Sequence, residues 1–118
     1  MQVTQSISIA ANTTDNNVLD TLGLRAKQVP GAAGALYAVS LLATGSAAGL
    51  EHSLFIGQDQ PVERSVVNAQ NRIPVVPDDA VTPQPIAAES GEQIQIEVTN
   101  TTGGALTYVF TLMVEPVG

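Results

Sequence analysis

The strict alternation of side chains over residues 93–99 is the feature that most limits how this chain folds. The run reads Gln-Ile-Gln-Ile-Glu-Val-Thr, so every second residue is apolar. A period of two places all the apolar side chains on one face of an extended strand, whereas a helix would scatter them around its axis. Turn-forming residues flank the run at 90–92 and 100–104. This part of the chain is therefore a strand with one buried face.

A second strand is predicted for residues 105–114, which Glu115 and Pro116 bring to an end. Alternation assigns one face of that strand to Leu106, Tyr108, Phe110 and Leu112, and the other face to Thr107, Val109, Thr111 and Met113. Because only a short glycine-containing loop separates the two runs, we expect residues 92–115 to form an antiparallel hairpin.

Three further strands are predicted closer to the start of the chain. Residues 3–9 alternate in the same way and end in a polar loop at 12–17. Residues 35–44 are apolar on both faces, and residues 50–57 resume an extended pattern after a Gly-Ser-Ala-Ala-Gly turn. Periodicity alone leaves a buried helix open for 35–44. The flexible turn and the extended run after it favour a hairpin of two strands.

Residues 18–29 carry an ambiguous pattern. Val18, Leu22 and Arg25 would share one face of a short helix, whereas Gly23 interrupts it. We favour an irregular strand here, with the helix as the alternative.

Residues 58–90 differ from the rest because five prolines crowd there, and each removes a backbone donor from any sheet. One strand is predicted for residues 62–67. We expect the remainder to be extended chain on the surface, or edge segments that touch a neighbouring molecule.

Together these segments predict an all-β protein, a single antiparallel β-sandwich over residues 1–118 with about seven to eight strands. The turns lie near the spacing expected of a sandwich. The strand count does not separate a jelly-roll strand order from an immunoglobulin-like one.

The charge balance excludes several classes of function. Eleven acidic residues against four basic ones give a net charge of −7, which disfavours direct binding to nucleic acid. There is no cysteine, so disulfides and thiolate sites are absent. The sequence shows no secretory signal and no apolar run of membrane-spanning length, so we expect synthesis in the cytoplasm and no membrane partner.

Charged residues make up only 13% of the chain, about half the usual share, while 44% are apolar. A surface so poor in charge is often covered by neighbours. We therefore expect a homo-oligomer or a lattice. The basic residues are few enough that some are expected to pair with acids on a partner; they are Arg25, Lys27, Arg64 and Arg72.

Catalysis finds little support in the sequence. His52 is the single histidine, and a serine triad would have to combine it with Ser53 or Ser65. No Gly-x-Ser-x-Gly nucleophile elbow is present. We expect His52 to lie on the solvent face of a strand, and we predict that the chain is not an enzyme and has no catalytic or cofactor-binding residue.

The best carboxylate cluster in the sequence comprises Asp59, Glu63, Asp78 and Asp79. Calcium takes six to eight oxygen ligands, but no EF-hand spacing is present, so no metal site is predicted and calcium at these residues stays open. The aromatic residues are Tyr37, Phe55, Tyr108 and Phe110. All four lie in predicted strands, where core packing is their default role, and this leaves no aromatic platform for a sugar. The Asn-x-Thr sequences at Asn12 and Asn100 are interpreted as turns.

The segment from Gly91 to Gly103, followed by its long apolar strand, resembles the closing hairpin of viral and phage jelly-roll or β-sandwich domains. It is also similar to bacterial immunoglobulin-like modules, and it covers about a fifth of the chain. In size and character the whole chain resembles the small decoration, or cement, proteins of tailed phages. These are cysteine-poor β proteins that bind the capsid exterior, commonly as trimers.

This resemblance implies a structural virion protein, most simply a capsid decoration protein that bridges major capsid subunits on the capsid exterior. The implied partners are the major capsid protein or other virion proteins. A jelly-roll shell subunit, a tail or fibre protein, and a bacterial β-sandwich adhesin or binding module are the alternatives. The absence of a basic arm favours an outer position over a shell that encloses nucleic acid.

Overall fold

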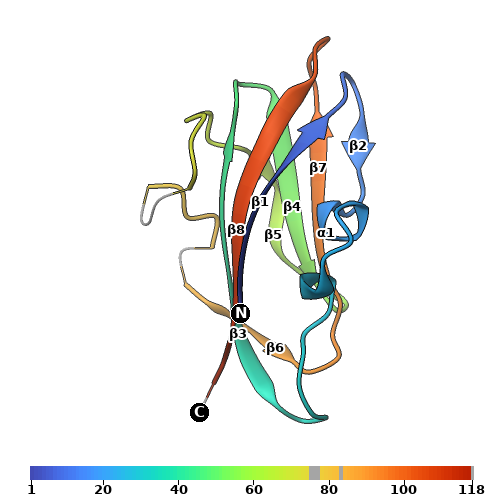
Figure 1. Cartoon of the computed structure of the whole chain (residues 1–118), viewed down its shortest axis with the longest axis vertical. Coiled ribbons are helices and arrows are strands. Elements are labelled where there is room, and N and C mark those ends of the chain that lie inside the picture. Colours follow the sequence, from blue (N-terminus) through green and yellow to red (C-terminus); the bar gives the residue numbers. More distant parts are fainter. Residues whose placement is uncertain (75–77, 83, 118) are drawn as a thin grey trace.

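Two four-stranded antiparallel sheets pack face to face in the computed structural model, which describes residues 1–74, 78–82 and 84–117 (Figure 1). The first sheet has the order β1 (Gln2–Ile9), β8 (Leu106–Pro116), β3 (Leu36–Gly45) and β6 (Ile86–Glu89). The second sheet has the order β2 (Thr14–Asp15), β7 (Ile94–Asn100), β4 (Leu50–Ile56) and β5 (Asp59–Val66). The prediction of an all-β antiparallel sandwich with about eight strands is confirmed.

The strand order is that of a jelly roll. The paired strands are β4 with β5, β3 with β6, β2 with β7, and β1 with β8. The chain is thus one long hairpin that turns between β4 and β5 and then rolls up, so that β8 also pairs with β3 and β7 with β4. The order left open between jelly-roll and immunoglobulin-like arrangements is therefore the jelly-roll one.

Two predicted hairpins are wrong, although the strands in them are correct. The strands β7 and β8 follow each other in sequence but lie in opposite sheets, and the same holds for β3 and β4. Each connecting loop crosses from one sheet to the other. The buried side chain of Asn100 holds the first crossing, because its amide donates to the Ile9 carbonyl in β1 (3.0 Å) and to the Gly104 carbonyl (2.8 Å).

The hairpin that does form joins β4 to β5 through Gly57 and Gln58. Gly57 has a φ of +58°, a left-handed conformation that glycine adopts without strain. The strand predicted at 62–67 is confirmed as β5, which begins three residues earlier, at Asp59, and ends at Val66.

The strand favoured for residues 18–29 is wrong, and the helical alternative is correct. A short helix, α1 (Val18–Thr21), is followed by a 3₁₀ turn (Arg25–Lys27). The Asn17 side chain caps α1 by accepting from the Leu19 amide at 3.2 Å. Val18 and Leu19 are fully buried, so burial against the sheets stabilises a helix that is too short to form alone. No helix among the described residues is long and apolar enough to cross a membrane.

The core lies between the sheets and is centred on β8. Tyr108 and Phe110 are fully buried with their rings 5.8 Å apart, as the alternation in 105–114 predicts. Tyr37 packs against the core from β3, while Phe55 points away from it, on the outer face of the second sheet, where it is half-buried. The aromatic residues therefore do lie in strands, and three of the four belong to the core.

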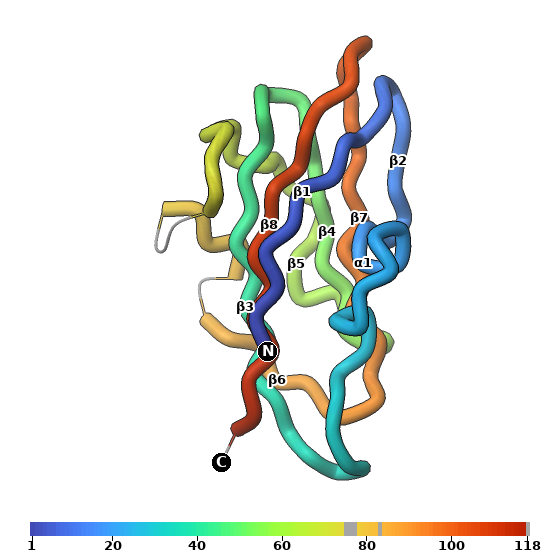
Figure 2. The backbone as a smooth tube through the Cα atoms, viewed as in Figure 1, coloured from blue at the N-terminus to red at the C-terminus, as the bar shows by residue number. Residues whose placement is uncertain are grey.

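Residues 68–74 and 78–82 run alongside the upper half of β3, the part that β6 does not pair with (Figure 2). The Ala43 amide donates to the Asp79 carbonyl at 3.1 Å, and the Val81 amide donates to the Leu41 carbonyl at 2.8 Å. This proline-containing segment therefore covers an edge of its own sheet.

The Asp79 side chain, fully buried, ties that covering segment together. Its carboxylate accepts from Arg72 Nε (3.3 Å) and from Asn68 Nδ2 (3.2 Å). The neighbouring Asp78, in contrast, is largely exposed, and its carboxylate lies 3.9 Å from Arg72 Nη2, farther than that of Asp79 lies from Arg72. The two adjacent carboxylates thus differ in burial and in contacts.

Replacing Asp79 by alanine is expected to lower the free energy of unfolding by about 2 kcal/mol, because the buried carboxylate that accepts hydrogen bonds from Arg72 and Asn68 is lost. The matched variant Asp78→Ala should change it by less than about 0.5 kcal/mol, since exposed ion pairs contribute little. Urea unfolding of both variants measures the difference. Equal effects at the two positions would contradict the anchoring role of Asp79.

Candidate functional site

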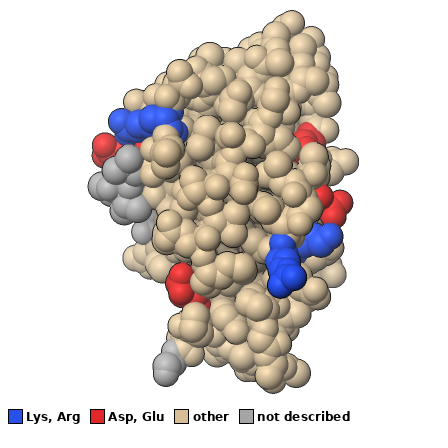
Figure 3. Space-filling view, viewed as in Figure 1, with Lys and Arg blue, Asp and Glu red and all other residues tan. Residues whose placement is uncertain are grey.

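The outer face of the first sheet carries no charged side chain over most of its area. Its exposed and half-buried residues are Thr4, Ser6 and Ser8 of β1, Thr107, Val109 and Met113 of β8, and Ala38 and Ser40 of β3, whereas Leu42, Thr44 and Thr111 on the same side are buried. Figure 3 views the molecule from this side and shows a broad central area without Lys, Arg, Asp or Glu. We call this surface the uncharged face.

Local alternation produces the uncharged face. The inward residues of these strands are large and aliphatic or aromatic, whereas the outward residues are mainly Ser and Thr. Adjacent strands are linked on the outside by a hydrogen bond between the hydroxyls of Thr4 and Thr111 at 2.9 Å. The result is a surface of short side chains with little conformational entropy to lose on contact.

The opposite sheet has a charged outer face. Glu97 lies on β7, and Glu51 on β4 forms an ion pair with Arg64 of β5 at 2.6 Å. The outer faces of the two sheets therefore differ in their charged side chains. Contact through the uncharged face costs the least desolvation of charge.

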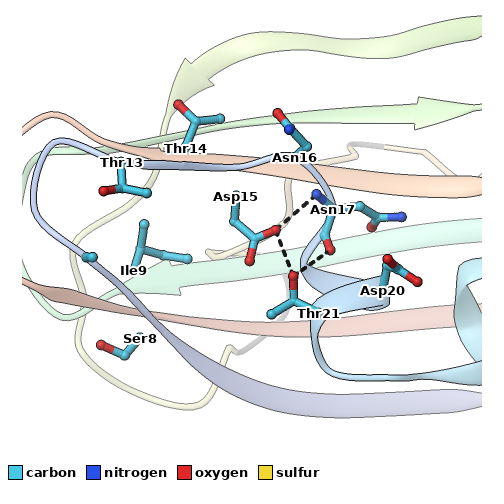
Figure 4. A pocket seen from close by; sticks show the side chains of 10 residues that line it. Ser8, Ile9, Thr13, Thr14, Asp15, Asn16, Asn17, Asp20 and Thr21 are labelled. Atoms are coloured by element: carbon cyan, nitrogen blue, oxygen red, sulfur yellow. Dashed lines mark hydrogen bonds between the residues drawn. The ribbon is translucent and has the colours of Figure 1, made fainter.

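A polar groove lies between the end of β1, the β1–β2 loop and α1, with a volume of about 530 Å³ (Figure 4). Asp15 points into it, and its Oδ1 accepts from the Asn17 amide (3.1 Å) and the Thr21 hydroxyl (3.0 Å). The other carboxylate, Asp20, pairs with Lys27 at 3.0 Å. Both carboxylates are thus engaged in local contacts that shape the loop.

The expectation that His52 faces solvent is wrong. Its parity on β4 is that of Leu50, Leu54 and Ile56, all of which point inward, and the side chain is buried. Its Nδ1 lies 2.8 Å from the Tyr108 hydroxyl. Burial lowers the pKa of His52 to about 4, and burial raises the pKa of Tyr108, so both groups are neutral near pH 7.

The structure brings His52 near one of the two serines considered for a triad. A pocket of about 180 Å³ is lined by His52, Ser65 and Asp79, whereas Ser53 lies on the opposite face of β4. A triad needs a carboxylate on one imidazole nitrogen, but the Tyr108 hydroxyl takes Nδ1 here. The arrangement fits a buried polar pair in the core better than it fits an activated nucleophile.

The four carboxylates that the sequence groups together are spread over three grooves. Asp59 lines a groove with Glu89, Glu63 lines a second one on β5, and Asp78 and Asp79 line the His52 pocket. Over residues 1–74, 78–82 and 84–117, no three His, Cys, Asp or Glu residues come together as a metal site would require. The cluster in the sequence is therefore not a cluster in space.

The structure gives three of the four basic residues partners within the chain. These pairs are Lys27 with Asp20, Arg64 with Glu51, and Arg72 with Asp79. They are formed without a neighbouring molecule, so the expected pairing with a partner's acids stays a prediction. Asn12 lies in a turn with a φ of 52°, which confirms its interpretation as a turn residue, whereas Asn100 is buried and is the last residue of β7, so the turn begins after it.

The fold and the surface define this chain as a jelly-roll β-sandwich with one charged and one uncharged face. No protein-family model, no curated protein and no solved structure matches it.

Proposed function

We propose that this protein is a structural component of a virus particle, a decoration protein that binds the capsid exterior through the uncharged face. The observation that carries the proposal is the concentration of short, uncharged side chains over three neighbouring strands. Each contact between such side chains and a capsid subunit contributes only a small binding free energy. A capsid lattice multiplies these contacts, because many copies bind neighbouring sites at once.

Two further properties support this setting. Jelly rolls recur among viral capsid proteins, although the fold alone does not define a function. The net charge of −7 disfavours contact with packaged nucleic acid, so an outer position is more favourable than an inner one.

The proposal is tested by co-sedimentation with empty capsids assembled from the major capsid protein encoded with this chain. Binding should saturate at a fixed ratio of copies per capsid subunit. The variant Ser40→Glu/Thr107→Glu places two charges on the uncharged face and should weaken binding at least tenfold. No binding of the unaltered protein would overturn the proposal.

The matched control is Gln95→Glu/Thr99→Glu, which adds the same charge to the outer face of the second sheet. Binding by this variant should equal that of the unaltered protein. If both double variants lose binding equally, the effect comes from net charge and the uncharged face is not the contact surface.

A further inference from the structure

The four outer edges of the two sheets are protected to very different degrees. A sheet edge exposes unpaired backbone groups, and proteins usually block it with charge, proline, a bulge or a very short strand. The edge strand β5 contains Pro61 and three charged residues, and its pairing with β4 is irregular. Two further edge strands are short: β2 has only two residues, and β6 has four and ends in Glu89.

The remaining edge strand, β1, has none of these devices. It has eight residues, Gln-Val-Thr-Gln-Ser-Ile-Ser-Ile, with no charge and no proline. Its register with β8 continues without a shift from Gln2 to Ile9. Among the described residues no strand pairs with its outer side, since β1 ends the sheet. A long, regular, uncharged edge is a template for another strand.

The register shows which backbone groups are available on that edge. The Val114 amide donates to the Met1 carbonyl at 2.8 Å. The backbone N–H and C=O groups of Met1 and of every second residue after it therefore point toward β8. The intervening residues of β1 direct their N–H and C=O groups outward. These residues are Gln2, Thr4, Ser6 and Ser8, and all four are exposed.

We propose that two copies of this chain pair through β1, antiparallel and related by a two-fold axis beside Gln5, to form one continuous eight-stranded sheet. One register uses the whole edge: it pairs Gln2 with Ser8 of the second copy, and Thr4 with Ser6. About eight backbone hydrogen bonds then form, two for each pair. The same register places Val3 against Ile7 on the inner side, where both are only partly covered.

The symmetry of this register points to a second copy as the occupant, because each outward-facing residue of β1 finds its partner on the same strand of another copy. Two molecules that each carry a net charge of −7 repel each other over most approaches. Across this two-fold axis every facing side chain on β1 is neutral, so the two paired strands place no like charges opposite each other. The pairing concerns the free chain and does not require binding to a capsid.

The oligomeric state is the first test. Light scattering after size exclusion should give twice the chain mass of 12.2 kDa for the unaltered protein. An edge-to-edge pair closes after two copies, so a monomer or a trimer at every concentration would overturn the inference.

Charge variants test the register. In Thr4→Lys/Ser6→Lys, lysines face each other across the axis, and a monomer is expected. In Thr4→Lys/Ser6→Asp, the same positions carry opposite charges, and the dimer should be retained. The control Gln58→Lys/Gln60→Lys adds two lysines at exposed positions of the distant β4–β5 hairpin and should remain dimeric. A dimeric Thr4→Lys/Ser6→Lys variant would overturn the inference.

A single cysteine gives an independent measurement, since the chain has none of its own. In the proposed register Gln5 faces itself in a non-hydrogen-bonded pair, with Cα atoms about 4.5 Å apart. That distance is within the range of a disulfide. Oxidised Gln5→Cys should therefore cross-link nearly completely, whereas Thr4→Cys, displaced diagonally by roughly 7–8 Å, should not. Cross-linking of Thr4→Cys in preference to Gln5→Cys would contradict the register.

Discussion

Phe110→Ala is expected to lower the free energy of unfolding by about 4 kcal/mol, a large part of the total stability of a domain of this size. Phe110 is fully buried in β8, between the two sheets and next to the ring of Tyr108. Removing its ring loses both the transfer free energy of the side chain and the contacts around the cavity that remains. Chemical denaturation followed by circular dichroism measures the change.

Phe55→Ala is the matched control, because it makes the same replacement on the outer face of the second sheet. Phe55 is half-buried and lies outside the core, so its loss should cost about 1 kcal/mol. If the two variants are destabilised equally, Phe110 is not the centre of the core.

A loss of stability of about 3 kcal/mol is expected as the pH falls from about 6.5 to about 4, owing to His52 alone. Its pKa in the folded protein is about 4, below the ordinary value of 6.5, because burial disfavours the charged form. Between these pH values the unfolded chain binds a proton that the folded chain does not. The stabilisation of the folded protein by neutral His52 is therefore complete above pH 6.5, declines as the pH falls, and is absent below pH 4.

The variant His52→Gln separates this effect from the titration of carboxylates in the same range. Glutamine keeps a polar partner for the Tyr108 hydroxyl but does not titrate. Its free energy of unfolding should change less between pH 6.5 and 4 than that of the unaltered protein. Identical pH profiles would show that His52 is protonated to the same extent in both states.

The sequence predicted local structure well wherever alternation was strict. The strands predicted at 3–9, 93–99 and 105–114 form over Gln2–Ile9, Ile94–Asn100 and Leu106–Pro116, and the inward positions of β8 are those that the pattern assigns. The inward position of His52 was also readable, because it shares the parity of Leu50 and Leu54. The chemistry of histidine suggested solvent, but the period of the strand decided its direction.

Which strands pair with each other was harder to predict from the sequence. A short loop between two strands is compatible with a hairpin in one sheet or with a crossing between two sheets, since the local backbone pattern is the same. The choice at the β7–β8 connection depends on contacts such as that of Asn100 with the Ile9 carbonyl, 91 residues away in sequence. The helix at Val18–Thr21 likewise depends on burial of Val18 and Leu19 against β7, far away in the sequence.

The sequence by itself determined the class of fold and the charge balance, since alternation and composition are properties of the chain. The tertiary structure alone decided which strands pair, that Asp79 is buried while Asp78 is exposed, and that β1 is an edge. An edge exists only once every other strand has found its neighbours. No local pattern in the sequence records which strand is left without one.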